Sequence, residues 1–166
     1  MKKLLFLLTG RLPCRLIKVK GQPYLERYYL FRLFGITFYL HRFLNGDGDE
    51  YLHDHPFKLS GSLVLTGFYH ERSVRWLDMS DEKFRHLKPG KVNLIGPHKF
   101  HQILFSEPDT WTLFWHAKRV KNWGFLMKGK TSNSTIYVRP YDQTSSDWHK
   151  DAPRGCDAGR EPFVKR

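Results

Sequence analysis

Short apolar segments separated by turn residues constrain the fold of this chain more than any other feature. They begin at Tyr24 and recur at the spacing of about 8–12 residues that is typical of all-β barrels and sandwiches. No long helical period follows residue 20. We expect strands over residues 24–34, 36–43, 59–69, 74–77, 91–95, 100–105, 111–116, 123–127 and 135–138, the first two forming a hairpin around Gly35. The pattern therefore predicts an all-β domain.

The two ends of the chain lack this pattern. Leu4, Leu5, Leu8 and Leu12 fit one face of a helix, which Pro13 limits to the first residues. The stretch after residue 141 is polar, with Gly, Pro and Asp scattered through it, which is typical of a tail. We predict a basic N-terminal arm or short helix over 1–23, a barrel over 24–141 and a polar C-terminal tail over 142–166.

Length and composition allow one folded domain with an excess of positive charge. The 166 residues are 40% hydrophobic and 16% aromatic, enough for a single core. The formal net charge is +12, and residues 1–35 hold eight Lys or Arg against one acid, Glu26. Such an excess favours polyanionic partners, among them nucleic acid and nucleotides. The alternative, that the charge only keeps the protein soluble, is equally open.

The N-terminus resembles the start of a signal peptide but is too short for one. Its apolar run, residues 4–8, is five residues long, whereas a signal peptide needs about 7–15. No stretch approaches the roughly 18 apolar residues of a membrane span. Cys14 and Cys156 lie near opposite ends, and we interpret both as free thiols in a reducing compartment. We expect a cytoplasmic protein without membrane contact.

A pair of histidines carries the main chemical signal. His53 and His55 are two residues apart, so on an extended chain both imidazoles point to one face and can bind one ion. A metal ion of this kind needs three or more ligands in a fixed geometry. In a chain with nine histidines such a pair also arises by chance.

The spacing around the pair resembles the first motif of the cupin superfamily. His53 and His55 are followed after four residues by Ser60 and after six more by Gly67, and Gly67 falls in the register of the motif. In the family a glycine normally precedes the motif, and Gly48 of this chain lies one place away from that position. The first motif normally carries a Glu ligand where this chain has Ser60.

A later segment resembles the second cupin motif. His101 follows Gly90 by eleven residues, the spacing of the metal histidine in that motif, and Pro97 lies one place beyond the usual proline. The segment departs from the motif at His98, where the motif has Gly, and at Phe105, where it has Asn. The two motifs together cover residues 36–116, about half of the chain.

The resemblance implies a fold and a metal centre. The fold is a double-stranded β-helix, the cupin jelly-roll barrel, with the ion inside it. His53, His55 and His101 bind one divalent metal ion, and the loss of the Glu implies a three-histidine site similar to that of the thiol dioxygenases. Fe(II) is the expected metal, with Mn, Ni or Zn as alternatives, because open positions on Fe(II) suit dioxygen chemistry. Cupins also often dimerise through their sheets, so a homodimer is a further expectation.

Other residues near the motifs are candidates for substrate and proton chemistry. We predict that Arg42 and Tyr51 bind the substrate, because they flank the turn that leads into the histidine pair, and Arg is suited to carboxylates and phosphates. Tyr51 and His98 are the candidate catalytic residues, with His98 as a proton shuttle or fourth ligand. His41 is interpreted as a hydrogen-bonded strand histidine, and Asp54 as a side chain that points outward or braces a turn.

Three functions remain open at this point. The first is a metal-dependent enzyme, a non-haem iron dioxygenase or hydroxylase that acts on a small anionic molecule held by an Arg. The second is a binding protein without catalysis, which captures a nucleotide or small anion in the barrel or nucleic acid on its basic surface. The third is a barrel used only for oligomerisation, which fits the histidine pair least because buried histidines without a metal are costly as charges.

Overall fold

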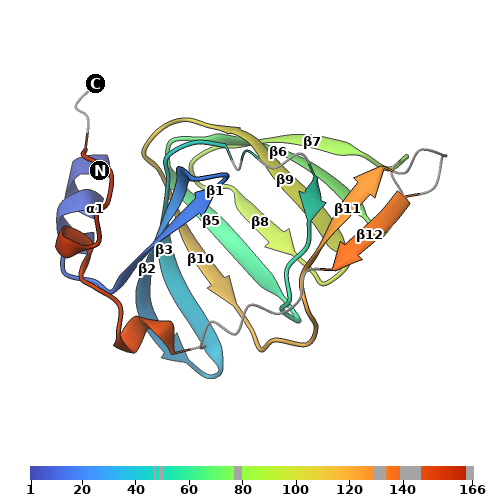
Figure 1. Cartoon of the computed structure of the whole chain (residues 1–166). Coiled ribbons are helices and arrows are strands. Elements are labelled where there is room, and N and C mark those ends of the chain that lie inside the picture. Colours follow the sequence, from blue (N-terminus) through green and yellow to red (C-terminus); the bar gives the residue numbers. More distant parts are fainter. Residues whose placement is uncertain (47, 49–50, 77–79, 129–133, 139–146, 164–166) are drawn as a thin grey trace.

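Two antiparallel sheets of six strands each lie face to face and form a barrel (Figure 1). The computed structural model describes residues 1–46, 48, 51–76, 80–128, 134–138 and 147–163. The first sheet has the order β1-β2-β3-β10-β5-β8, and the second has the order β12-β11-β4-β9-β6-β7. The expected all-β jelly-roll barrel is therefore confirmed.

The strands of each sheet come from both halves of the chain. The first sheet contains β1 (Cys14–Val19), β2 (Gln22–Leu33), β3 (Ile36–Phe43), β10 (Thr110–His116), β5 (Ser60–Thr66) and β8 (Val92–Ile95). The second sheet contains β12 (Ser134–Val138), β11 (Gly124–Lys128), β4 (Leu52–His53), β9 (Lys99–Ser106), β6 (Tyr69–Arg75) and β7 (Lys83–Leu87).

Most of the predicted strands are present, with two differences. The predicted strand 59–69 is divided between β5 and β6, because the chain turns at Gly67, which has a φ of +74°. Of the separate strand predicted over 74–77, Val74 and Arg75 end β6, Trp76 lies in a turn, and residue 77 lies outside the described residues. No pattern in the sequence predicted β7, because four of its five residues are exposed and it lacks an apolar alternation.

The predicted hairpin β2–β3 is confirmed and defines the inner face of the first sheet. Phe34 and Gly35 turn the chain with φ values of 47° and 77°, which suits a two-residue hairpin. Three neighbouring pairs then face inward: Leu25 opposite Phe43, Arg27 opposite His41, and Tyr29 opposite Tyr39. The inner face thus changes along the hairpin from apolar to polar to aromatic.

The apolar end of the barrel is closed by a core from both sheets. Its buried residues are Leu25, Phe43, Val64, Tyr69, Leu87 and Ile103, with Ile17 and Tyr24 packed against them. A second cluster, Leu52, Val74, Phe100 and Leu126, lies within the second sheet. Burial of these side chains supplies the main driving force for folding, at roughly 25 cal/mol per Å² of apolar surface.

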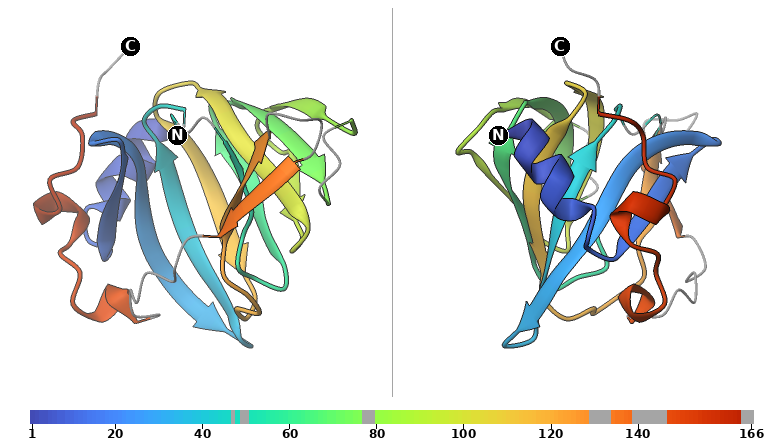
Figure 2. Two further views of the ribbon diagram at one scale, coloured as in Figure 1. Left: turned by 45° about the vertical axis from the view of Figure 1, so that its right-hand side comes forward. Right: turned by 90° about the vertical axis from the view of Figure 1, so that its left-hand side faces the viewer.

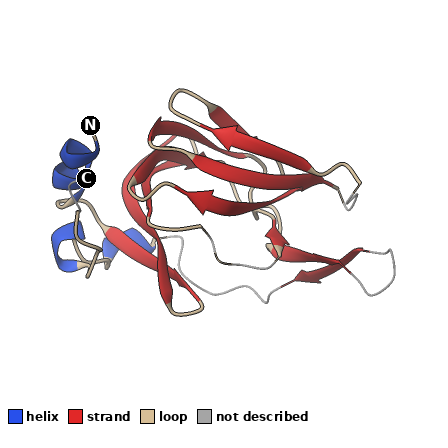
Figure 3. Ribbon diagram, turned by 90° about the horizontal axis from the view of Figure 1, so that it is seen from above, coloured by secondary structure: helices blue, strands red, loops and turns tan. Residues whose placement is uncertain are grey.

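The two ends of the chain pack together on the outer face of the first sheet. The C-terminal segment comprises residues 147–163, and its residues 153–163 lie beside the helix α1 (Lys2–Thr9) there (Figures 2 and 3). Trp148 and His149 of the same segment stack instead on the inward-facing rings of Tyr39 and Tyr29. The segment includes the 3-10 turns η1 (Trp148–Lys150) and η2 (Gly155–Asp157). Gly155 N donates to Leu12 O at 2.9 Å, and Cys14 N donates to Pro153 O at 2.9 Å.

A small outer core joins these ends to the barrel. Cys14, Tyr28 and Trp111 are buried there, and Leu5, Phe6 and Leu12 pack against them. Burial raises the pKa of the Cys14 thiol to about 12, while Cys156 is exposed, and both thiols are free. The region predicted as an arm or helix, residues 1–23, holds α1 and also β1, so the sheet begins at Cys14. Within the described ranges, no helix has both the length and the apolarity to cross a membrane.

Candidate metal centre

Three histidines cluster where β4 meets β9. His53 in β4 lies opposite His101 in β9, and His55 follows two residues after His53. The potential ligand atoms of the three side chains all lie within 4.8 Å of one another. The Nε2 atoms of His55 and His101 are 2.9 Å apart. The structure thus brings together the three residues that the sequence predicted as metal ligands.

The environment keeps His53 and His55 in the form that binds metals. Burial, assisted by the charge of His101, lowers the pKa of His53 to about 3. The same two causes lower the pKa of His55 well below its ordinary value. A neutral imidazole offers a lone pair to a metal ion, and a protonated one does not. The donor set therefore fits a divalent transition metal.

Glu71 of β6 orients His101 from behind. Its carboxylate accepts a hydrogen bond from His101 Nδ1 at 2.8 Å, which leaves Nε2 directed at the cluster. A carboxylate in this position fixes the tautomer and increases the basicity of a metal-binding imidazole. Glu71 is fully buried at 0% exposure. Burial alone would raise its pKa, but the hydrogen bond and charge of His101, together with Lys99, lower that pKa to about 2.

A buried polar network holds Glu71 in turn. Lys99 Nζ donates to Glu71 at 2.8 Å, and Asn93 Nδ2 donates to it at 2.6 Å. Asn93 also donates to the hydroxyl of Tyr69 at 3.3 Å. Sequence analysis missed Glu71, and the only signal for it is that it alternates with Tyr69 and Ser73, which are also buried.

The positions where the chain departs from or matches the cupin motifs are explained by local contacts. Ser60, which replaces the usual Glu, lies with its Oγ 3.4 Å from His55 Nδ1 and donates to Ile95 O at 3.2 Å. Gly67 has a positive φ, and a Cβ there would lie 2.3 Å from the Thr110 hydroxyl. Gly90 also has a positive φ, of +82°. Both motif glycines therefore occupy turns that other residues adopt with difficulty.

Asp54 braces the loop that carries the histidine pair. It is 6% exposed, and its Oδ1 accepts a hydrogen bond from Gly124 N at 2.8 Å. Its Oδ2 forms an ion pair with Lys121. The bracing role expected for Asp54 is thus present, and it ties the segment after β4 to the start of β11.

Arg42 does not lie beside the histidines, which corrects the predicted substrate contact. It follows His41 on β3, so its side chain leaves the opposite, outer face of the sheet. There it donates to Asp109 at 2.6 Å and to Glu26 at 3.0 Å, and two backbone carbonyls of the C-terminal segment take its other N–H groups. Arg42 is 1% exposed and serves as the centre of an ion-pair network.

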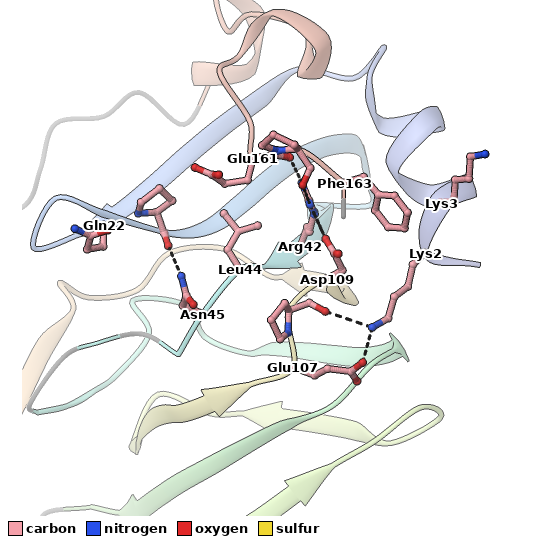
Figure 4. A pocket seen from close by; sticks show the side chains of 13 residues that line it. Lys2, Lys3, Gln22, Arg42, Leu44, Asn45, Glu107, Asp109, Glu161 and Phe163 are labelled. Atoms are coloured by element: carbon pink, nitrogen blue, oxygen red, sulfur yellow. Dashed lines mark hydrogen bonds and ion pairs between the residues drawn. The ribbon is translucent and has the colours of Figure 1, made fainter. Parts of the chain in front are cut away.

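A cavity of about 600 Å³ borders this network. Figure 4 shows Arg42 and Asp109 on its wall, with Lys2 bonded to Glu107 nearby. The cavity lies between α1, the C-terminal segment and the outer side of the barrel, away from the histidines. Four charged residues of its wall pair with one another, Lys2 with Glu107 and Arg42 with Asp109.

The two candidate catalytic residues lie outside the cluster. Tyr51 precedes β4 by one residue and is 39% exposed. His98 precedes β9 and is exposed, with its ring stacked on Trp76 at a centroid distance of 4.0 Å. The structure does not bring His98 to the three histidines. The catalytic roles of both residues stay predictions.

His41 and Arg27 occupy the inner face near the cluster. Arg27 Nε donates to His41 Nε2 at 3.0 Å, so the expected hydrogen-bonded strand histidine is confirmed. His41 stacks on Phe114 at 4.7 Å, and Phe114 in turn contacts His55 at 5.8 Å. Trp111 points the other way, into the outer core. Arg27 is one of the eight Lys or Arg within residues 1–35, and the sequence pattern did not single it out.

Comparison with known proteins places this geometry in a known fold. No family model and no curated protein matches the chain. Among solved structures, Fe(II)-HppE with the alternative substrate (S)-1-HPP matches with a TM-score of 0.50 and 15% identity, covering 66% of this chain and 57% of that one. Fe(II) HppE in complex with substrate gives 0.50 and 14%, covering 66% and 58%. This chain thus spans less than two thirds of the length of HppE.

A smaller protein matches over more of its own length. A cupin-2 domain protein from Rhodospirillum rubrum has a TM-score of 0.48 and 19% identity, covering 66% of this chain and 72% of that one. At such identities the likeness shows the fold alone. Together with the two facing sheets, the two HppE matches lead to one conclusion: this chain has a jelly-roll barrel of two sheets like that of HppE, which is the fold that the cupin resemblance of its sequence implies.

Proposed function

We propose that this chain is a metal-dependent cupin enzyme, a non-haem iron dioxygenase or hydroxylase that acts on a small anionic molecule. The observation that carries the proposal is the three-histidine cluster, in which His101 is buried with a carboxylate behind it and His53 and His55 are half-buried. A hydrogen bond from a metal-binding histidine to a carboxylate is the usual outer support of a metal centre. Fe(II) is favoured because a structure of similar fold, HppE, is an Fe(II) protein.

Each residue of the site has a definable task. His53, His55 and His101 would hold the ion, and Glu71 keeps Nε2 of His101 directed at it. When bound by three histidines, Fe(II) supplies open coordination positions for dioxygen and substrate. Asp54 fixes the loop that carries His55. Tyr51 and His98 remain candidates for proton transfer.

A second function is non-catalytic capture of a nucleotide or another small anion, or of nucleic acid on the basic surface. The net charge of +12 favours it. In that case the metal is structural or not required. Cytoplasmic location and a homodimer stay predictions under either function.

Metal analysis tests the proposed enzyme first. The chain is purified without an affinity tag, loaded anaerobically with Fe(II), Mn(II), Ni(II) or Zn(II), and analysed by elemental mass spectrometry. We expect about one metal ion per chain in the wild type and none in the His53→Ala/His101→Ala variant. The matched control is His70→Ala/His86→Ala, which removes two exposed, stacked histidines on the outer face of β6 and β7.

Oxygen consumption then separates the two functions. Metal binding with oxygen uptake in the presence of small thiols or acids supports the dioxygenase. Metal binding without turnover of any tested substrate favours the binding protein. Failure of every metal to bind, in protein shown to be folded by circular dichroism, contradicts the proposed enzyme.

A further inference from the structure

A row of polar side chains crosses the inner face of the first sheet at the level of the histidine cluster. We name it the Arg15–Thr112 row. Arg15 of β1 lies opposite Arg27 of β2, Arg27 opposite His41 of β3, and His41 opposite Thr112 of β10. Directly opposite residues of antiparallel strands point to the same face of a sheet. All four side chains therefore leave the same, inner face.

The charges of the row are not balanced. Like charges directly opposite each other on neighbouring strands are destabilising, and Arg15 and Arg27 are such a pair. Arg27 donates to the neutral ring of His41 and lies 5.5 Å from the ring centroid of Tyr39. Within the part of the chain that the structure describes, no carboxylate forms an ion pair with either guanidinium.

Thr112 adds an unsatisfied hydroxyl to the same row. Its side chain is 0% exposed, and its Oγ1 has no hydrogen-bond partner among the described residues. A buried hydroxyl without a partner is destabilising. The row thus combines two cations that have no carboxylate partner among the described residues with one buried hydroxyl group that has no hydrogen-bond partner.

The row is adjacent to the candidate metal ligands. Phe114 contacts both His41 and His55, with ring centroids 4.7 Å and 5.8 Å away. The positive charge of Arg27 is also among the causes that lower the pKa of His55. A ligand held by Arg27 would therefore lie next to the three-histidine cluster.

We propose that Arg27, with Arg15 and Thr112, binds the oxyanion head group, a carboxylate or a phosphate, of the small molecule on which the protein acts. Arg presents a planar set of donors that matches either group in two parallel hydrogen bonds. Thr112 donates a further hydrogen bond through its hydroxyl. His41 positions Arg27 by accepting its Nε–H. The inference deepens the proposed function and rests on it for the placement of the ligand beside a metal.

The test uses metal-free protein, so that its result does not depend on the metal site. Thermal unfolding is followed at pH 7 in sodium acetate, sodium phosphate or sodium chloride at matched ionic strength. We expect acetate or phosphate to raise Tm above the chloride value by about 3–6 °C at roughly ten times its dissociation constant. The anion with the larger effect identifies the class of head group.

Substitutions test whether the anion-dependent rise in Tm depends on residues of the Arg15–Thr112 row. Arg27→Met should abolish the anion-dependent rise, and Thr112→Val should weaken anion binding by about tenfold, the loss of one hydrogen bond to a charged group. Arg27→Lys keeps the charge but loses the paired donors, so it should weaken anion binding. This variant replaces Arg27→Met in the test if Arg27→Met does not fold. Arg75→Met, which removes an exposed cation at the end of β6, is the matched control and should respond like the wild type.

The outcomes separate this inference from the proposed function. No stabilisation of the wild type by either anion overturns the inference, whatever the metal analysis shows. Equal loss of the effect in Arg75→Met also overturns it, because binding then depends on general surface charge. Anion binding that requires Arg27 in a protein that binds no metal supports the row while it contradicts the enzyme.

Discussion

Two arginines of the same sheet have opposite surroundings. Arg42, on the outer face of β3, is 1% exposed and meets the carboxylates of Glu26 and Asp109 at 3.0 Å and 2.5 Å. Arg27, on the inner face of the neighbouring strand, meets a neutral histidine and an aromatic ring. Arg42 is buried and Arg27 is half-buried, and among the described residues only Arg42 has carboxylates beside it.

The contrast distinguishes a charge that stabilises the fold, at Arg42, from a charge that is available to a ligand, at Arg27. Removing one partner of a buried ion pair leaves the other charge uncompensated, so such a network stabilises the fold as a unit. An inward-facing cation without a carboxylate reduces stability unless something else neutralises it. The outer face of this sheet is therefore arranged for stability, and the inner face for binding.

Substitution of the two arginines should give the largest difference. Arg42→Met leaves Glu26 and Asp109 without their cation, and we expect a loss of about 3–5 kcal/mol in the free energy of unfolding. Arg27→Met should change that free energy by less than about 1 kcal/mol, or raise it, in chloride buffer. Urea denaturation at pH 7 measures both. Equal destabilisation by the two substitutions would remove the distinction between the faces.

Substitution of Glu71, which orients His101, should give the next largest effect. Glu71→Gln keeps the size of the side chain but weakens its hydrogen bond from His101, so we expect metal affinity to fall about 10–100-fold. Titration with Zn(II) or Co(II) measures it. Glu107→Gln, on the outer face, is the control and should leave the affinity unchanged. An unchanged affinity in Glu71→Gln would mean that Glu71 serves the fold only.

Acid should destabilise the inner face more than the outer one. Burial lowers the pKa of His116 to about 4 and that of His41 well below its ordinary value of 6.5. Below pH 6.5 the unfolded chain therefore binds protons that the folded chain does not, and stability falls as pH decreases. For His116 the loss continues to about pH 4, with a slope of at most about 1.4 kcal/mol per pH unit.

Removal of His116 checks this sign. His116→Gln takes away a group that titrates only in the unfolded chain over this range, so the variant should lose less stability than the wild type between pH 6.5 and 4. Urea midpoints of the metal-free proteins at several pH values provide the measurement. A steeper loss in the variant would show that His116 becomes charged in the folded protein.

The smallest effect is expected at the edge of the outer network. Lys2 and Glu107 pair at 2.7 Å, but their side chains are 27% and 38% exposed. An ion pair in contact with water contributes about 0–1 kcal/mol, so Lys2→Ala should cost less than about 1 kcal/mol. The same urea denaturation would detect a larger loss, which would indicate that the outer network extends to α1.

Spacing along the chain predicted the ligands but not their support. His53 and His55 share a face because they are two positions apart on an extended chain, and the cupin resemblance added His101. Glu71 lies 30 residues from His101 in sequence, and its pairing depends on which strands become neighbours. Sequence periodicity shows which face a residue takes, but it does not show what lies across that face.

Arg42 and Arg27 also show that sequence periodicity does not reveal the contacts of a side chain. Both are strand-borne cations in the sequence, and proximity to the histidine pair favoured Arg42. The alternation of β3 already directed Arg42 away from His41, yet only the packing of Glu26, Asp109 and the C-terminal segment showed that its donors are occupied. The C-terminal segment reaches Arg42 from 119 residues away along the chain.

Patterns along the chain predict the all-β class, most of the strands and the three histidines, because these features depend on order that is local or has a fixed spacing. The carboxylate behind His101, the ion pairs around Arg42 and the row across β1, β2, β3 and β10 could be found only in the folded protein. These depend on contacts between distant segments, and such contacts arise only when strand order and register are fixed.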